Sequence, residues 1–212
     1  MQTFSRHAAL LIIDVQNGFD APHWGRRNNP EMESRIVELL AAWRASRRPV
    51  IHAKHMSVDP TSPLRPGQPG NDFKRAVTPI DGEAVVEKRV HSCFIGTPLE
   101  AELRQHGFDT LVIVGLMTNH CVSTTARMAG NLGFAAWVVS DATATFDRVG
   151  PDGIAYPAEQ IHAIALSDLH GEFATVVDTA AVIAALKVAG IAAPKISVTE
   201  PLPTTHSSRR TS

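Results

Sequence analysis

The stretch TLVIVGLMTNHCVSTTARMAGNLG, from Thr110 to Gly133, joins an apolar run to a longer polar and apolar segment. Residues 110–116 are almost all apolar, which is typical of a central parallel strand buried on both faces. A helix is predicted from about Asn119 to Leu132, and Gly133 ends it. The next run, AAWVVSD, predicts another strand. Strand, helix and strand in succession form the unit from which parallel sheets are built.

The same alternation extends to both sides of this stretch. Short β-rich runs predict four further strands, at 8–13, 50–55, 84–88 and 173–178. Amphipathic stretches predict four further helices, at 31–47, from about 97, at 157–170 and at 179–189. Right-handed crossovers then favour an α/β fold: a three-layer, doubly wound, Rossmann-like parallel sheet of six strands in the order 3-2-1-4-5-6.

The chain length and composition indicate one domain with a tail. A chain of 212 residues can bury roughly 70% of its unfolded surface, which is enough for a core and a pocket. We expect one domain over residues 1–190 and a Pro/Ser/Thr-rich tail over 191–212. Residues 59–79 contain five prolines, and we interpret them as a surface loop or lid.

Charge and cysteine content narrow the class of protein. The 20 basic and 21 acidic side chains give a net charge of -1, which favours neither a nucleic acid nor a membrane surface as partner. No apolar run reaches the roughly 18 residues of a membrane span, and the N-terminus has no signal-peptide pattern. Two cysteines cannot form a disulfide framework. We therefore expect a cytoplasmic protein that acts on a small molecule.

Three chemically active side chains follow predicted strands, where ligands bind in doubly wound sheets. Asp14 follows the first strand, Lys88 ends the third, and Cys121 lies where the helix after the fourth begins. Each has a plainer interpretation: a turn-capping carboxylate, a surface lysine and a buried inert thiol. An acid, an ammonium and a thiol at one sheet edge nevertheless form a nucleophilic set.

The set predicts a covalent mechanism. We expect Asp14 to accept the thiol proton, Lys88 to hold Asp14 and stabilise the thiolate, and Cys121 to attack a carbonyl carbon. The helix start and the ammonium are expected to lower the pKa of the Cys121 thiol. Backbone N–H groups of the turn GLMTNHC are suited to stabilise the oxyanion.

At these residues the chain resembles the isochorismatase-like cysteine hydrolases. This superfamily includes nicotinamidases, N-carbamoylsarcosine amidohydrolase, ureidoacrylate hydrolases, streptothricin hydrolase and isochorismatases. The resemblance runs from about Ala8 to Val182, and it lies in LLIIDVQNGF, EKRVHSCFIGTPLEAEL, VIVGLMTNHCVSTTARMAGNLGF and DATATF. It implies the same roles for Asp14, Lys88 and Cys121. It also implies a cis peptide before Met117, an oxyanion hole from the N–H groups of Met117 and Cys121, and a homodimer or homotetramer.

Two departures from the family pattern refine the expected activity. Nicotinamidases carry an Asp-x-His pair after the second strand that binds a metal, whereas this chain has Lys54 and Met56 there. We therefore expect no metal, no other cofactor and no nicotinamidase activity. Isochorismatases that cleave vinyl ethers often lack the nucleophilic cysteine, so Cys121 favours hydrolysis of an amide, ureide or lactam C–N bond.

Six further residues are candidates for binding substrate, with ordinary packing or structural hydrogen bonds as the alternative for most: Gln16, Phe19, Trp24, His55, Phe94 and Asn119. His52 and His55 have an H-x-x-H spacing, but residues three apart on a strand point to opposite faces, so a shared metal is not expected. Cys93 follows no strand-to-helix turn, and we interpret it as a small core residue.

Three alternative functions remain open. A vinyl-ether hydrolase would rely on acid chemistry by Asp14. A relative without activity would bind its ligand only, although the complete Asp, Lys and Cys set argues against this. A nucleotide-binding module is disfavoured, because the first strand is followed by DVQNGF without a G-x-G-x-x-G pattern, and no Walker-type loop occurs.

Overall fold

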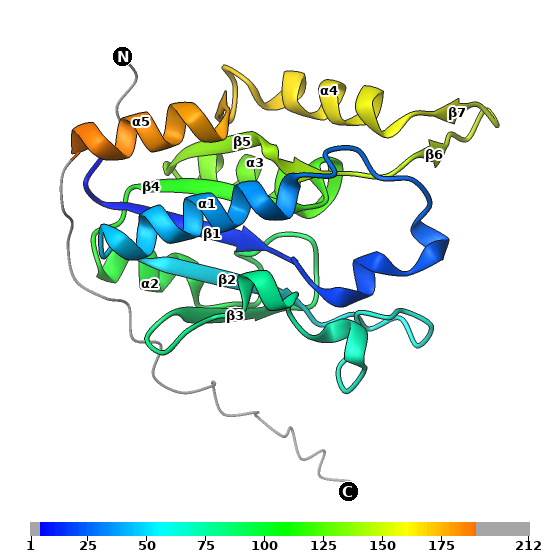
Figure 1. Ribbon diagram of the computed structural model, residues 1–212, viewed down its shortest axis with the longest axis horizontal. Helices are drawn as coiled ribbons and strands as arrows, with labels where there is room; N and C mark the ends of the chain where they lie inside the picture. The colour runs from blue at the N-terminus through cyan, green and yellow to red at the C-terminus, as the bar shows by residue number, and fades with distance from the viewer. Residues whose placement is uncertain (1–4, 190–212) are drawn as a thin grey trace, which may run out of the picture.

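A computed structural model describes residues 5–189, which form a six-stranded parallel sheet between two layers of helices (Figure 1). The strands lie in the order β3-β2-β1-β4-β5-β8, which is the predicted order, since β8 is the sixth predicted strand. Their bounds are Ala84–Lys88, Val50–His55, Ala8–Ile13, Thr110–Leu116, Ala135–Ala144 and Thr175–Val177 in that order. The expected tail lies outside the described residues, and the domain boundary at 190 stays a prediction.

Side chains of each central strand alternate between two apolar cores because successive residues of a strand point to opposite faces. On β1, Leu10 and Ile12 belong to one core, whereas Leu11 and Ile13 belong to the other. Helices α1 (Met32–Ala45) and α5 (Thr179–Ala189) cover the first face. Three helices cover the second: α2 (Leu99–Gln105), α3 (Ser123–Asn131) and α4 (Ala158–Leu169).

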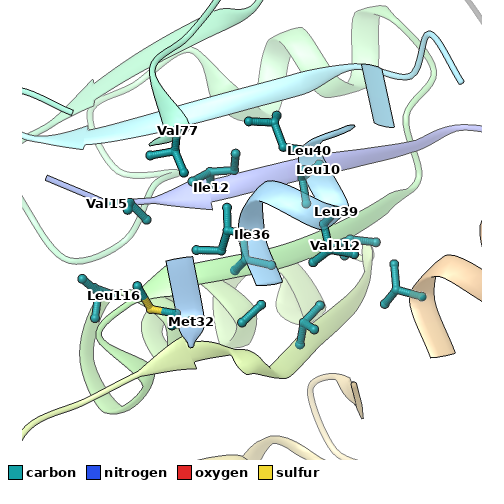
Figure 2. Packing of buried hydrophobic residues seen from close by; sticks show 14 of the residues in the cluster. Leu10, Ile12, Val15, Met32, Ile36, Leu39, Leu40, Val77, Val112 and Leu116 are labelled. Atoms are coloured by element: carbon teal, nitrogen blue, oxygen red, sulfur yellow. The ribbon is translucent and has the colours of Figure 1, made fainter. Parts of the chain in front are cut away.

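Figure 2 shows how α1 packs on the first face. Its buried residues recur every three or four positions, so they form one stripe along the helix. The stripe consists of Met32, Ile36, Leu39, Leu40 and Trp43. Figure 2 shows the first four of these over side chains of β1 and β4. Full burial of such side chains stabilises the fold by about 1.5–3 kcal/mol each. The sheet is thereby a rigid base for the groups at its carboxyl edge.

Some predicted boundaries differ from the structure. Strand β5 extends three residues beyond the predicted end, because a bulge opposite Ile113 and Gly115 lets pairing with β4 resume at Thr143. Strand β8 is shorter than predicted, and a small hairpin of β6 (Arg148–Val149) and β7 (Ala155–Tyr156) was not expected. The helix after β4 begins one residue early, as a π-helical turn named η5 (Thr118–Val122) that continues into α3.

The proline-rich segment 59–79 is a loop, as expected, and part of it packs against the end of β2. It contains two short 3-10 turns, η3 (Pro69–Asn71) and η4 (Arg75–Val77). Asn71 is 3% exposed and donates hydrogen bonds to the carbonyls of His55 and Leu64. These bonds fix the loop beside the end of β2.

Within residues 5–189, none of the helices has the length and apolar character needed to cross a lipid bilayer. The expected location and oligomeric state stay predictions.

Candidate active site

The three predicted catalytic side chains meet at the carboxyl edge of the sheet. Lys88 Nζ lies 2.7 Å from Asp14 Oδ2 and 3.3 Å from Cys121 Sγ. Asp14 follows β1, Lys88 ends β3, and Cys121 lies in η5 after β4. All three are buried, at 0%, 1% and 7% exposure. The fold therefore joins residues that are separated by 74 and 33 positions in the chain.

The backbone at the end of β1 aims Asp14 at this point. Its φ is 54°, in the left-handed region that Asp adopts more readily than most residues. Its N–H donates to Ala53 O at 3.0 Å, and its carbonyl accepts from the N–H of Gln16 at 2.8 Å. Beside it, Gly115 lies so close to β1 that a Cβ would stand 2.1 Å from Ile13 O. Only glycine fits there, next to the base of the site.

The Lys88 ammonium is the centre of the cluster. Besides Asp14 and Cys121, it contacts His55 Nδ1 at 3.1 Å and donates to Val90 O at 3.3 Å. Burial lowers the pKa of Lys88, but attraction by Asp14 and by Cys121 outweighs it, and the net shift is upward. Lys88 is therefore a fixed positive charge at neutral pH.

The pKa of Cys121 differs from the expectation. Burial is the largest cause and raises the pKa of the thiol, and the Asp14 carboxylate raises it further, whereas Lys88 offsets only part of this. The predicted lowering of the Cys121 pKa is therefore wrong for the free protein, because the sulfur is less exposed and nearer to a carboxylate than the sequence indicated. The thiol needs a nearby base to lose its proton.

One oxygen of Asp14 is available for that purpose. Oδ2 is held by Lys88, but Oδ1 is buried and has no hydrogen-bond partner among the described residues. Ligand atoms of Asp14, His55 and Cys121 all lie within 4.8 Å of one another. A buried carboxylate oxygen without a partner is costly, so its retention beside a thiol is consistent with a proton-accepting role.

The same three groups do not fit a metal ion. The Lys88 ammonium already contacts an atom of each of them, so a positive charge stands at the centre of the donor set. Lys54, where nicotinamidases place a ligand, lies with Nζ 5.6 Å from the centroid of the Phe73 ring.

The turn that carries the nucleophile contains the expected cis peptide, between Leu116 and Met117. The carbonyl of Met117 accepts hydrogen bonds from the N–H groups of His120 and Val122 at 3.0 and 3.2 Å. Cys121 lies in η5, at the start of the helical segment that α3 continues. Its N–H and that of Met117 stay the predicted oxyanion donors.

His55 and Gln16 have different roles in the structure. His55 joins the site through Lys88, and burial followed by the Lys88 charge lowers the pKa of its imidazole. Gln16 is fully buried, and its amide bonds to the backbone of His55 and Asn71. Gln16 therefore holds the end of β2 and the 59–79 loop together, and a role in substrate binding stays a prediction. His52 bonds to Glu83 instead, away from His55.

The aromatic candidates divide between two places. Phe19 and Trp24 form a cluster with Phe146, with ring centroids 5.2–6.2 Å apart, and Trp24 is half-buried. Phe94 is buried in the other core and stacks on Phe134 at 5.8 Å. Phe94 thus packs in the core, whereas Trp24 keeps part of its surface exposed, and substrate binding by either ring stays a prediction.

Asn119 is half-buried, two positions before the nucleophile. Its Oδ1 accepts a hydrogen bond from Thr145 Oγ1 at 2.5 Å, which fixes the amide. It also lines a hollow of about 660 Å³ between α3 and α4 that includes none of the three catalytic candidates. The hollow and the Asp14, Lys88 and Cys121 cluster are therefore separate features.

Sequence reasoning missed two histidines at the site. His91 Nδ1 lies 3.4 Å from Cys121 Sγ, and its exposed ring stands between those of His55 and His120, at centroid distances of 6.3 and 5.6 Å. The pKa of His120 is lowered to about 4, chiefly by burial and to a smaller extent by electrostatic interaction with Arg148 and His91. The position of His91 three residues after Lys88 was the available signal.

Cys93 is buried, as expected, and burial raises the pKa of its thiol to about 12.

Comparison with known proteins shows the family of this chain. The isochorismatase domain profile matches residues 8–181. The uncharacterized isochorismatase family protein YrdC of Bacillus subtilis is 46% identical over 171 residues, which is 81% of this chain and 91% of that protein. Nicotinamidase 3 of Arabidopsis thaliana is 31% identical over 187 residues, covering 82% and 86%. The crystal structure of a hydrolase of this family from Chromobacterium violaceum has a TM-score of 0.86 at 45% identity, covering 89% and 97%. The chain therefore belongs to the isochorismatase family of hydrolases.

Proposed function

We propose that this protein is a cysteine hydrolase that cleaves a C–N bond of a small amide, ureide or lactam through an acyl-enzyme. The observation that carries the proposal is the contact of Lys88 with both Asp14 and Cys121 in a buried site. Three relatives have names that describe C–N hydrolases: nicotinamidase 3, ureidoacrylate amidohydrolase RutB and streptothricin hydrolase. These names support the bond type and leave the substrate open.

Each member of the cluster has one role in the proposed reaction. Asp14 Oδ1 is placed to take the thiol proton, while Lys88 keeps Oδ2 in place and offsets the negative charge on sulfur. The sulfur attacks the carbonyl carbon, and the N–H groups of Met117 and Cys121 stabilise the oxyanion. Asp14 then gives its proton to the departing amine. It next removes a proton from the water that hydrolyses the acyl-enzyme, and the thiol is restored.

The test is turnover of a panel of small amides, ureides and lactams, with amine release measured by mass spectrometry. Removing a nucleophile commonly costs several orders of magnitude in rate, so Cys121→Ala is expected to lose at least about 10³-fold. Cys93→Ala is the matched control: it removes the other buried thiol and should keep the activity. Intact mass of the wild-type protein during turnover should show an acyl adduct on Cys121.

The same experiment separates the proposal from its alternative. A vinyl-ether hydrolase would release a carbonyl product from a vinyl-ether substrate and would keep that activity in Cys121→Ala. Retention of any hydrolysis at the wild-type rate in Cys121→Ala contradicts the covalent mechanism.

A further inference from the structure

His91, an exposed residue, also contacts the proposed nucleophile. Among the described residues, Cys121 Sγ has two hydrogen-bonding contacts: Lys88 Nζ at 3.3 Å and His91 Nδ1 at 3.4 Å. An ammonium can only donate, so it cannot accept the thiol hydrogen. Of these two contacts only the His91 nitrogen, in the tautomer that carries its hydrogen on Nε2, can accept the S–H hydrogen; the other acceptor beside the sulfur is the Asp14 carboxylate.

The surroundings of His91 allow it to exchange protons with solvent. Its side chain is exposed, whereas Asp14 is fully buried behind Lys88. Facing its ring are His55 from β2 and Cys121 with His120 from η5, and Lys88 from the end of β3 contacts both His55 and Cys121. Arg148 of β6 acts on His120 beyond it. A proton on His91 can pass to water without crossing the buried ion pair.

We propose that His91 is a second proton acceptor for the Cys121 thiol, on its solvent side. In this step the S–H bond breaks and an N–H bond forms at Nδ1, which leaves a thiolate beside an imidazolium and the Lys88 ammonium. Two cations next to sulfur favour the thiolate, and a thiolate is the reactive form of cysteine. In the free protein this transfer is reversible, and during turnover the imidazolium gives the proton to the departing amine; the proton that Asp14 then takes from water restores the thiol. The inference rests on the proposed function, because it assigns a role toward the same nucleophile.

The step needs a titratable nitrogen at the place of Nδ1. His91→Asn is the most informative substitution, because the Asn amide reaches about as far as Nδ1 and keeps a hydrogen-bonding group, but it does not titrate. His120→Gln is the matched control, since that ring packs against His91 and has no contact with the sulfur among the described residues. His91 is exposed, so its substitution is not expected to disturb the core, and His120 is half-buried.

The experiment follows alkylation of Cys121 by iodoacetamide from pH 5 to 10, with Cys93 as internal reference, by peptide mass spectrometry. We expect the wild-type rate to rise in a step between about pH 5 and 8, where imidazoles titrate, before the thiol itself ionises. His91→Asn should lose this step and react at least about 10-fold more slowly at pH 7, whereas His120→Gln should keep it.

The outcomes separate this inference from the proposed function. If Cys121 is labelled selectively but the profile has no step, or keeps its step in His91→Asn, His91 is not an acceptor and the inference is overturned. If Cys121 is labelled no faster than Cys93, the nucleophile assignment fails as well. A second measurement needs no His91 variant: the NMR titration of the His91 ring should shift when Cys121 is replaced by Ser, and an unchanged titration would refute the contact.

Discussion

Replacing Lys88 by Met should destabilise the protein strongly because it leaves Asp14 as an unpaired buried charge. Lys88 and Asp14 have side-chain exposures of 0% and 1%, and their atoms are 2.7 Å apart. Removing one partner of such a pair typically costs about 3–5 kcal/mol. Met preserves most of the side-chain volume, so little of the loss comes from packing. The free energy of unfolding should therefore fall by about 3–5 kcal/mol at pH 8.

Urea unfolding followed by tryptophan fluorescence measures this loss. With an m-value of about 2 kcal/mol/M, the midpoint should fall by roughly 1.5–2.5 M. Lys54→Met is the matched control on the neighbouring strand. It removes a half-buried lysine that lies over the Phe73 ring, and it should lower the free energy of unfolding by less than about 1 kcal/mol.

A double variant identifies the cause. Combining Lys88→Met with Asp14→Asn removes both charges, and it should regain at least about 2 kcal/mol of the loss, since a buried ion pair often contributes little net stability. A Lys88→Met protein within 1 kcal/mol of wild type, or a double variant less stable than Lys88→Met, would refute the buried-charge reasoning.

Three further predictions concern the strand packing, the opposite end of the sheet and the nucleophile. Gly115→Ala should lower the free energy of unfolding by more than about 2 kcal/mol, because its Cβ would stand 2.1 Å from Ile13 O. Gly133→Ala, whose Cβ would have no atom within 4 Å, should lower it by about 1 kcal/mol. Thermal unfolding compares the two variants, and equal losses would contradict the steric argument. Burial raises the pKa of Glu83, but hydrogen bonds from Arg44 and His52 outweigh it and hold the value at about 2. This lowered pKa adds stability above about pH 4.5 that is lost as the pH falls toward 2. The wild-type protein should therefore be more stable than Glu83→Gln by on the order of 3 kcal/mol at pH 6, and this difference should shrink in acid unfolding curves. A difference that stays constant with pH would exclude the assignment. Because Asp14 raises the pKa of Cys121, Asp14→Asn should speed iodoacetamide labelling of Cys121 at pH 8 while abolishing turnover, and slower labelling would contradict the electrostatic assignment.

The sequence by itself determined the order of elements and the position of the catalytic candidates. Strands β1, β2, β3 and β4 have the predicted bounds, because an apolar run closed by a turn is a local pattern that the buried sheet requires. Asp14, Lys88 and Cys121 could be found because each stands where such a run ends. The topology of a doubly wound sheet then brings those ends to one edge.

Only the tertiary structure decided how the side chains at that edge pair. The contact of His91 with Cys121 spans 30 residues, and that of Gln16 with Asn71 spans 55, so neither leaves a local pattern in the sequence. Phe94 follows the same strand as His91 but packs into the second core, because the chain turns between them. The upward shift in the pKa of Cys121 likewise depends on burial and on the nearness of Asp14, which are distances in space between residues from different strands.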